Sequence, residues 1–269
     1  MPGGRVLNED QFKSLNEWFG LDNKAALVVG ASKGLGREIA LALSRAGADV
    51  ACAARNTSKL QETADAVSAL GRRAICVPTD VTQESQIVDL IKRSAQEFGR
   101  IDILFYCAGM MHAGSSLKIA SADWQRVLNT NLTGAYVTCR ETAKIMKTGG
   151  GGHIILITSM FVDRVLPYSL AYVVSKAGLS QMIRNLAFEW ARYGIRVNGI
   201  APGYFETDMP APVLKDPKAR ERVVGRIPLR RVGEPSEIGP LAVYLACGSS
   251  DYMTGEIICM DGGQAGNIV

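Results

Sequence analysis

Short apolar runs alternate along the chain with longer segments in which apolar residues recur every three or four positions. This alternation is typical of βαβ units, in which helices connect parallel strands. The predicted strands are Ala25–Val29, Asp49–Ala53, Ala74–Val77, Ile101–Tyr106, His153–Thr158, Arg196–Ile200 and Glu256–Met260. The predicted helices are Gly36–Ala46, Ser58–Leu70, Glu84–Phe98, Ala122–Met146, Leu170–Tyr193 and Pro235–Ala246. Continuous apolar strands are buried on both sides, so we expect helices on both faces of a parallel sheet.

The pattern predicts one domain, because no Pro/Ser-rich linker and no repeat divides the 269 residues. Residues 1–22 precede the first strand and form a predicted N-terminal extension, with a short helix around Asp10–Phe19 that packs on the body or on a neighbouring subunit. The domain itself is expected over residues 23–269. The segment Tyr204–Arg231, rich in Pro, Arg and Lys, interrupts the alternation before the last helix. Long insertions in compact domains are often lids, and we expect a substrate lid here.

Composition narrows the classes of function. The 30 basic and 26 acidic residues give a net charge of +4 without any block of like charges, so nucleic-acid binding is not expected. We see no secretory signal and no apolar stretch that would span a membrane. The six cysteines are scattered without a Cys-x-x-Cys pair, which favours reduced thiols in a cytoplasmic protein. With only His112 and His153 available, we expect no metal site and no histidine relay.

A glycine-rich turn follows the first predicted strand directly. It reads Gly30-Ala31-Ser32-Lys33-Gly34-Leu35-Gly36 and opens a predicted helix. Glycines allow a tight turn and close backbone approach, while the helix N-terminus offers free N–H groups and a positive dipole to a pyrophosphate. The position therefore predicts a nucleotide cofactor, with an ordinary turn as the alternative.

The residues after the second strand favour NADP(H) over NAD(H). An acidic residue there would hold a ribose 2′-hydroxyl, but the chain has Arg55 followed by Asn56. Lys33 adds a second cation in the glycine turn, and two cations suit a 2′-phosphate. Two solvated surface charges are the alternative interpretation. Asp80, after the third strand, either reaches the adenine edge or caps the next helix.

Tyr172 and Lys176 are four residues apart in a predicted helix and share one helix face. We expect Lys176, helped by a positively charged nicotinamide ring, to lower the pKa of the Tyr172 phenol. Such a phenol could exchange a proton near neutral pH without histidine. Ser159 ends the fifth predicted strand, so it would meet this helix at the carboxyl edge of the sheet, where ligands of open α/β sheets bind.

In combination, these motifs resemble the short-chain dehydrogenase/reductase family over about Asn23–Val269. The family pattern TGxxxGxG appears as Val29-Gly30 through Gly36, and its Asn-Asn-Ala-Gly stretch as Tyr106-Cys107-Ala108-Gly109. The resemblance implies a single-domain, Rossmann-type, doubly wound parallel sheet of seven strands with helices on both faces. It also implies a nicotinamide cofactor and a homotetramer built from the two longest helices and the last strand.

The resemblance assigns roles to matching positions. The implied catalytic residues are Asn131, Ser159, Tyr172 and Lys176. The implied cofactor-binding residues are Gly30, Ser32, Lys33, Gly34, Leu35, Gly36, Arg55, Asn56, Asp80, Val81, Ala108, Gly109, Tyr172, Lys176, Pro202, Gly203, Phe205 and Thr207. In the implied mechanism, Tyr172 exchanges the proton of the reacting oxygen, Ser159 orients that oxygen, Lys176 binds the nicotinamide ribose, and Asn131 holds a water in a proton relay. The hydride passes between the nicotinamide and the carbonyl carbon.

Two positions depart from the family pattern. Val29 replaces the usual Thr, and Tyr106-Cys107 replaces Asn-Asn. Both changes remove polar side chains from neighbouring strand ends beneath the cofactor, so the sequence does not define the fine positioning of the cofactor.

The substrate is less well defined than the reaction. The candidate substrate residues are Met160, Arg164, Leu166, Tyr204 and Met209, a mainly apolar set. Arg164 either receives a substrate carboxylate or phosphate or is a solvated loop residue. The sequence is similar to gluconate 5-dehydrogenases, and equally to ketoacyl-thioester and general carbonyl reductases. We expect an NADP(H)-dependent oxidoreductase acting on a small-molecule carbonyl or secondary alcohol; a non-catalytic cofactor-binding partner subunit is the alternative from a different class.

Overall fold

The computed structural model describes residues 15–266 of the chain. Within this range, seven strands form one parallel sheet in the order β3-β2-β1-β4-β5-β6-β7. The strands are β1 Ala25–Val29, β2 Asp49–Ala54, β3 Ala74–Pro78, β4 Ile103–Tyr106, β5 Gly152–Ile157, β6 Ile195–Pro202 and β7 Ile257–Met260. Each neighbouring pair is parallel, as the predicted fold requires.

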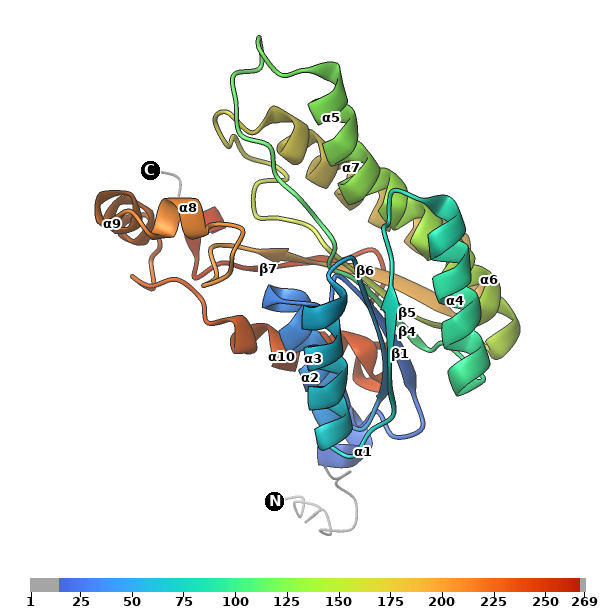
Figure 1. The fold of residues 1–269 in the computed structure, drawn as a ribbon. Helices are drawn as coiled ribbons and strands as arrows, with labels where there is room; N and C mark the ends of the chain where they lie inside the picture. The colour runs from blue at the N-terminus through green and yellow to red at the C-terminus, as the bar shows by residue number, and fades with distance from the viewer. Residues whose placement is uncertain (1–14, 267–269) are drawn as a thin grey trace, which may run out of the picture.

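Helices cover both faces of the sheet (Figure 1). One layer contains α2 Gly34–Arg45, α3 Thr57–Ala69 and α10 Ile238–Ala246; the other contains α4 Glu84–Phe98, α6 Gly134–Gly149 and α7 Leu170–Trp190. All five residues of β1 are buried, because both of its faces are covered. The doubly wound sheet predicted from the alternation is confirmed.

Helix α4 shows why the sequence adopts this arrangement. Its buried residues Ile87, Leu90, Ile91 and Phe98 recur at helical spacing and form one apolar face toward the sheet. The helix ends at Gly99, whose φ of 74° places it in the left-handed region that closes many helices. The helix predicted over Glu84–Phe98 is confirmed at both ends.

The helical stretch predicted over Ala122–Met146 is confirmed, but it contains a π-helix that the pattern did not predict. Helix α5 covers Ser121–Leu128, a π-helix covers Asn129–Thr133, and α6 follows from Gly134. We call residues 129–133 the π segment. A π-helix contains about one more residue per turn than an α-helix, and such segments are frequent at functional sites. Apolar periodicity does not reveal a single inserted residue, so the sequence pattern reads as continuous.

Segment 204–231 contains two short helices that the sequence did not predict. Helix α8 covers Ala211–Leu214 and α9 covers Pro217–Gly225. Asp216 caps α9 by accepting a hydrogen bond from the Lys218 N–H at 3.1 Å, and Pro217 occupies the first helical turn. Both helices project beyond the sheet near β7 (Figure 1).

The described part of the N-terminal extension packs on the body of the same chain. Helix α1 covers Leu15–Phe19, whereas residues 10–14 of the predicted Asp10–Phe19 helix lie outside the described residues. The Ser249 hydroxyl donates a 2.7 Å hydrogen bond to the Trp18 carbonyl, and Leu21 is buried. Among residues 15–266, no helix has the length and apolar character needed to cross a bilayer.

Candidate active site

A cavity of about 630 Å³ opens at the carboxyl ends of the strands. It lies where β1 and β4 are neighbours and the strand order reverses, which is where open α/β sheets bind ligands. Its wall is contributed by the residues that follow β1, β2, β3, β4, β5 and β6, and by the start of segment 204–231. The motifs predicted to act together therefore meet around one space.

The glycine turn, residues 30–36, forms one end of this cavity. Gly30 has a φ of +93°, and a Cβ on it would lie 2.7 Å from the Ala108 nitrogen. A Cβ on Gly36 would lie 2.2 Å from the Gly30 carbonyl oxygen. Helix α2 then starts at Gly34, and no side chain accepts a hydrogen bond from its first N–H groups. The turn fits a pyrophosphate, because backbone approach and unpartnered N–H donors are both present.

The neighbouring strand ends line the same space with polar groups. Arg55 is exposed there, next to Asn56, whose Oδ1 accepts a 3.0 Å hydrogen bond from the Lys59 N–H and caps α3. Asp80 accepts hydrogen bonds from the N–H of Thr82 at 2.9 Å and from its hydroxyl at 2.8 Å. Asp80 thus fixes the turn before α4 and lines the cavity, as a residue near the adenine would, but it does not cap α4, whose N-cap is Gln83 without a side-chain bond.

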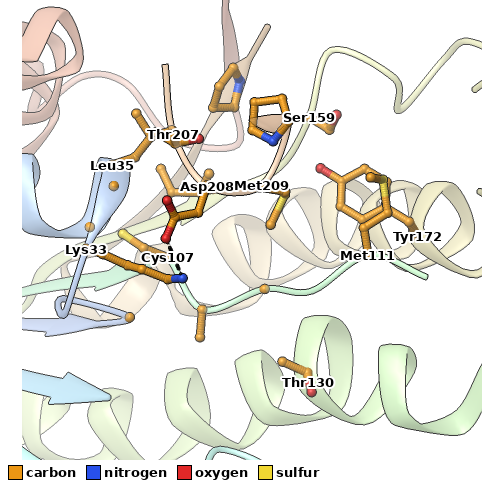
Figure 2. Close-up of a pocket in the computed structure, with 18 of the residues that line it drawn as sticks. Lys33, Leu35, Cys107, Met111, Thr130, Ser159, Tyr172, Thr207, Asp208 and Met209 are labelled. Atoms are coloured by element: carbon orange, nitrogen blue, oxygen red, sulfur yellow. Dashed lines mark hydrogen bonds and ion pairs between the residues drawn. The ribbon is translucent and has the colours of Figure 1, made fainter. Parts of the chain in front are cut away.

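Lys33, predicted to bind a 2′-phosphate, is paired with Asp208. The two groups lie 2.7 Å apart, with the Lys33 side chain 58% and the Asp208 side chain 68% exposed (Figure 2). The hydrogen bond from Lys33 lowers the pKa of the Asp208 carboxyl. Sequence reasoning missed Asp208, although it directly follows Thr207. Segment 204–231 therefore contacts the glycine turn.

Tyr172 and Ser159 lie at the other end of the cavity. The Tyr172 phenol lies near the Ser159 side chain (Figure 2), and both residues are buried. Burial raises the pKa of Tyr172, and the nearby Ser159 side chain opposes this rise. The expected lowering by Lys176 is therefore not produced by the protein alone, because desolvation of the phenol dominates.

Lys176 is buried below the phenol, with only 3% of its surface exposed. Its Nζ donates a 2.7 Å hydrogen bond to the Ile157 carbonyl and lies 5.9 Å from the centre of the Tyr172 ring. Burial lowers the pKa of Lys176 to about 8. The lysine is thus held by the end of β5, a contact that the sequence pattern did not indicate.

Asn131, in the π segment, acts as a buried connector. Its Oδ1 accepts from the Met110 N–H at 2.8 Å, and its Nδ2 donates to the Met110 carbonyl at 2.9 Å and to the Ser175 hydroxyl at 2.9 Å. Ser175 in turn donates to the Tyr172 carbonyl at 2.7 Å. Sequence reasoning missed Ser175, although it stands inside the Tyr-x-x-x-Lys motif.

Most predicted site residues line the cavity, but three do not. Asn131 lies behind the wall, as described above. Met160 is 4% exposed, and its N–H donates to the Pro202 carbonyl at 3.1 Å, so it belongs to the packed strand end. Arg164 lies close enough to Cys259 on β7 to oppose the rise in that thiol's pKa, and it is not a lining residue. Met160 is packed away from the cavity, whereas Arg164 is an exposed loop residue, as in the alternative interpretation.

Other side chains form the wall near Tyr172. The predicted residues Leu166, Tyr204 and Met209 are among them. Met111, Ala113, Phe161, Pro167, Ser169 and Val213 also line this part of the cavity. Phe161 and Tyr204 form an edge-to-face pair with ring centres 6.3 Å apart. The wall here is predominantly apolar, with hydroxyl groups interspersed.

The departures from the family pattern have defined positions. Val29 is buried at the end of β1. Cys107 lines the cavity, and burial raises the pKa of its thiol to about 12, although the nearby Lys176 opposes that rise. Cys107 is therefore a neutral thiol at physiological pH, without the thiolate that nucleophilic chemistry requires. Tyr106 is fully buried, with its hydroxyl bonded to the π segment.

Comparison with known proteins gives a consistent result. A family model described as enoyl-(acyl carrier protein) reductase matches residues 30–265. The 2-dehydro-3-deoxy-D-gluconate 5-dehydrogenase of Escherichia coli is 37% identical over 247 residues, which cover 91% of this chain and 96% of that protein. A short-chain type dehydrogenase/reductase from Mycobacterium marinum superposes with a TM-score of 0.88 at 37% identity, covering 93% of this chain and 99% of the other.

A gluconate 5-dehydrogenase from Burkholderia cenocepacia, in complex with NADP and tartrate, superposes with a TM-score of 0.91 at 30% identity. The match covers 95% of this chain and 100% of that structure. The fold, the motifs and these similarities agree over nearly the whole chain. The chain belongs to the short-chain dehydrogenase/reductase family of oxidoreductases.

Proposed function

We propose that this protein is an NADP(H)-dependent oxidoreductase that interconverts a small-molecule carbonyl compound and its secondary alcohol. The observation that carries the proposal is the buried Ser159–Tyr172 pair at one end of a cavity whose other end is the glycine turn. When bound, the nicotinamide supplies or accepts the hydride.

The residues that would hold the cofactor fit its parts. The N–H groups at the start of α2 suit the pyrophosphate, since the glycines of the turn have no Cβ that would block close approach of the phosphates. Arg55 and Lys33 provide cations for a 2′-phosphate, and the site has no carboxylate at the end of β2 to prefer a ribose hydroxyl. The NADP complex of the Burkholderia cenocepacia relative supports this choice.

Tyr172 would provide the proton and Ser159 the orientation. In reduction, the phenol of Tyr172 gives its proton to the carbonyl oxygen while the carbonyl carbon gains the hydride; in oxidation, the phenolate takes the proton of the alcohol. Ser159 donates a hydrogen bond to the same oxygen. The ammonium of Lys176 stabilises the phenolate that remains after reduction, because opposite charges attract strongly in a buried site.

A sugar acid is the second candidate for the substrate. The names of the Escherichia coli and Burkholderia cenocepacia relatives both refer to oxidation at carbon 5 of gluconate or a derivative. The apolar wall formed by Met111, Phe161 and Leu166 is instead compatible with less polar ketones. The two substrate classes are distinguished by turnover, and the proposed reaction type is the same for both.

The test is a panel of gluconate, 2-dehydro-3-deoxygluconate, simple ketones and acyl thioesters, each assayed with NADPH or NADH in reduction, or with NADP⁺ or NAD⁺ in oxidation. We expect turnover with at least one class and a preference for the phosphorylated nicotinamide. Absence of turnover across the panel, with folded protein that binds NADPH, would support a non-catalytic cofactor-binding subunit instead.

We also propose a homotetramer. Phe188 on α7 is 87% exposed and Tyr136 on α6 is 43% exposed, although both are large apolar residues on the long helices expected to pair. Light scattering on the purified chain measures the mass directly, and a monomer would contradict this expectation.

A further inference from the structure

Tyr106 connects the end of β4 to the π segment. The residue is fully buried, and its hydroxyl donates a 2.6 Å hydrogen bond to the Thr130 carbonyl. A buried tyrosine hydroxyl needs such a partner, because an unpaired polar group is costly in the interior. Tyr106 stands where the family pattern has the shorter asparagine.

The packing around the hydroxyl is tight. A Cβ on Gly134 would lie 2.9 Å from the Tyr106 hydroxyl oxygen and 2.6 Å from the Val81 carbonyl oxygen. The first residue of α6 therefore approaches Tyr106 as closely as a glycine allows. The junction between the π segment and α6 is held from the strand side by Tyr106.

The π segment in turn is linked to the helix that carries Tyr172. Asn131 follows Thr130 and donates a hydrogen bond to Ser175, which donates to the Tyr172 carbonyl; these distances are 2.9 and 2.7 Å. Asn131, Ser175 and the Tyr106 side chain are fully buried, so water does not compete for these bonds. A short chain of contacts thus runs from β4 to the backbone of Tyr172.

We propose that Tyr106 is a positioning residue that fixes the π segment and, through Asn131 and Ser175, the backbone that carries Tyr172. The kinetic part of this inference rests on the proposed function. Burial raises the pKa of Tyr106 well above its usual value, which keeps the hydroxyl a donor at any working pH. The alternative is that Tyr106 only fills space at the strand end.

Tyr106→Phe tests the proposal, because it removes the hydroxyl and retains the ring. We expect kcat to fall roughly 3- to 10-fold, the effect of losing one hydrogen bond, with the KM for NADPH changed less than about 2-fold. Amide hydrogen exchange is expected to accelerate at least about 5-fold in both residues 129–133 and residues 170–176. Tyr252→Phe is the matched control, since Tyr252 is a fully exposed tyrosine before β7, and it is expected to change neither quantity.

Ser175→Ala removes the hydroxyl that links Asn131 to the Tyr172 carbonyl, at the other end of the same chain of contacts. If the two contacts act together, the double variant loses less in kcat than the two single effects combined. Unchanged exchange in residues 170–176 of Tyr106→Phe would overturn the proposal even if no substrate had been found. Unchanged kcat in that variant, or additive effects in the double variant, would overturn it while leaving the proposed function intact.

Discussion

The Lys33 ammonium and the Asp208 carboxylate lie 2.7 Å apart and join the glycine turn to segment 204–231. The cation that suits a 2′-phosphate thus has a partner of its own within the chain. Both groups are more than half exposed, and exposed ion pairs stabilise proteins by no more than about 1 kcal/mol. A phosphate dianion can therefore displace Asp208 at small cost.

Replacing Asp208 by asparagine is expected to strengthen NADPH binding roughly 2- to 5-fold at low ionic strength, because Lys33 loses its competing anion. The gain is expected to shrink as salt screens the charges. Fluorescence titration at two salt concentrations measures both effects. Asp89→Asn on α4 is the control with the same change in charge, away from the cavity. Weaker NADPH binding to Asp208→Asn would show that this carboxylate helps to hold the cofactor.

Arg55→Asp is expected to reverse the preference between nicotinamides. The new carboxylate repels a 2′-phosphate and can accept a ribose hydroxyl, so we expect the affinity for NADPH to fall at least about 10-fold relative to NADH. Arg93→Asp on α4 changes the charge equally and serves as control. An unchanged NADPH-to-NADH ratio in Arg55→Asp would refute the assignment of Arg55 to the phosphate.

The sheet and the main motifs could be predicted from the sequence, because the information is local. Five buried residues in β1, the glycine turn behind them and the helical spacing of α4 are each visible in a short window. Parallel topology then places the strand ends at one edge, which brings Ser159 and Tyr172 together.

The rest of the site depends on contacts between distant segments. The Lys33–Asp208 pair joins positions 175 residues apart, and the bond from Asn131 to Ser175 spans 44. Met160 was expected at the substrate because it follows Ser159, but tertiary packing buries its side chain outside the cavity wall. The π segment was not predicted because one inserted residue does not visibly interrupt the apolar periodicity across α5 and α6.

His153 is expected to make the fold sensitive to acid. Burial, followed by the charge of Arg196, lowers the pKa of His153 to about 4, although Asp251 opposes the change. Between pH 6.5 and 4 the unfolded chain binds a proton that the folded chain does not, so the free energy of unfolding falls as the pH falls. We expect a loss of about 2–3 kcal/mol from this residue over that range.

His153→Gln is therefore expected to flatten the acid side of the stability profile, as measured by urea unfolding between pH 7 and 4. His112→Gln, at the chain's other histidine, is the control for the loss of one imidazole. An equally steep decline in His153→Gln would assign the acid sensitivity to other groups.

Lys176→Met is expected to raise the free energy of unfolding while abolishing turnover. With the pKa of Lys176 at about 8, the folded protein carries the full cost of a buried charge below pH 8, and this cost diminishes as the pH rises from 8 toward 10.5. We expect the methionine variant to be about 1–3 kcal/mol more stable at pH 7, with a smaller gain at pH 10, and to lose turnover. A variant less stable than the wild type at pH 7 would show that the bond to Ile157 outweighs the desolvation cost.

The most direct test of the proposed mechanism is the turnover of Tyr172→Phe with NADPH and the best carbonyl substrate from the panel. This variant keeps the ring and removes the proton that the reacting oxygen receives. We predict a loss of roughly 10²- to 10⁴-fold in kcat, with NADPH affinity within about 2-fold of the wild type. Retention of more than about a few per cent of the wild-type rate would contradict Tyr172 as the general acid, since a positioned acid contributes at least about 10²-fold.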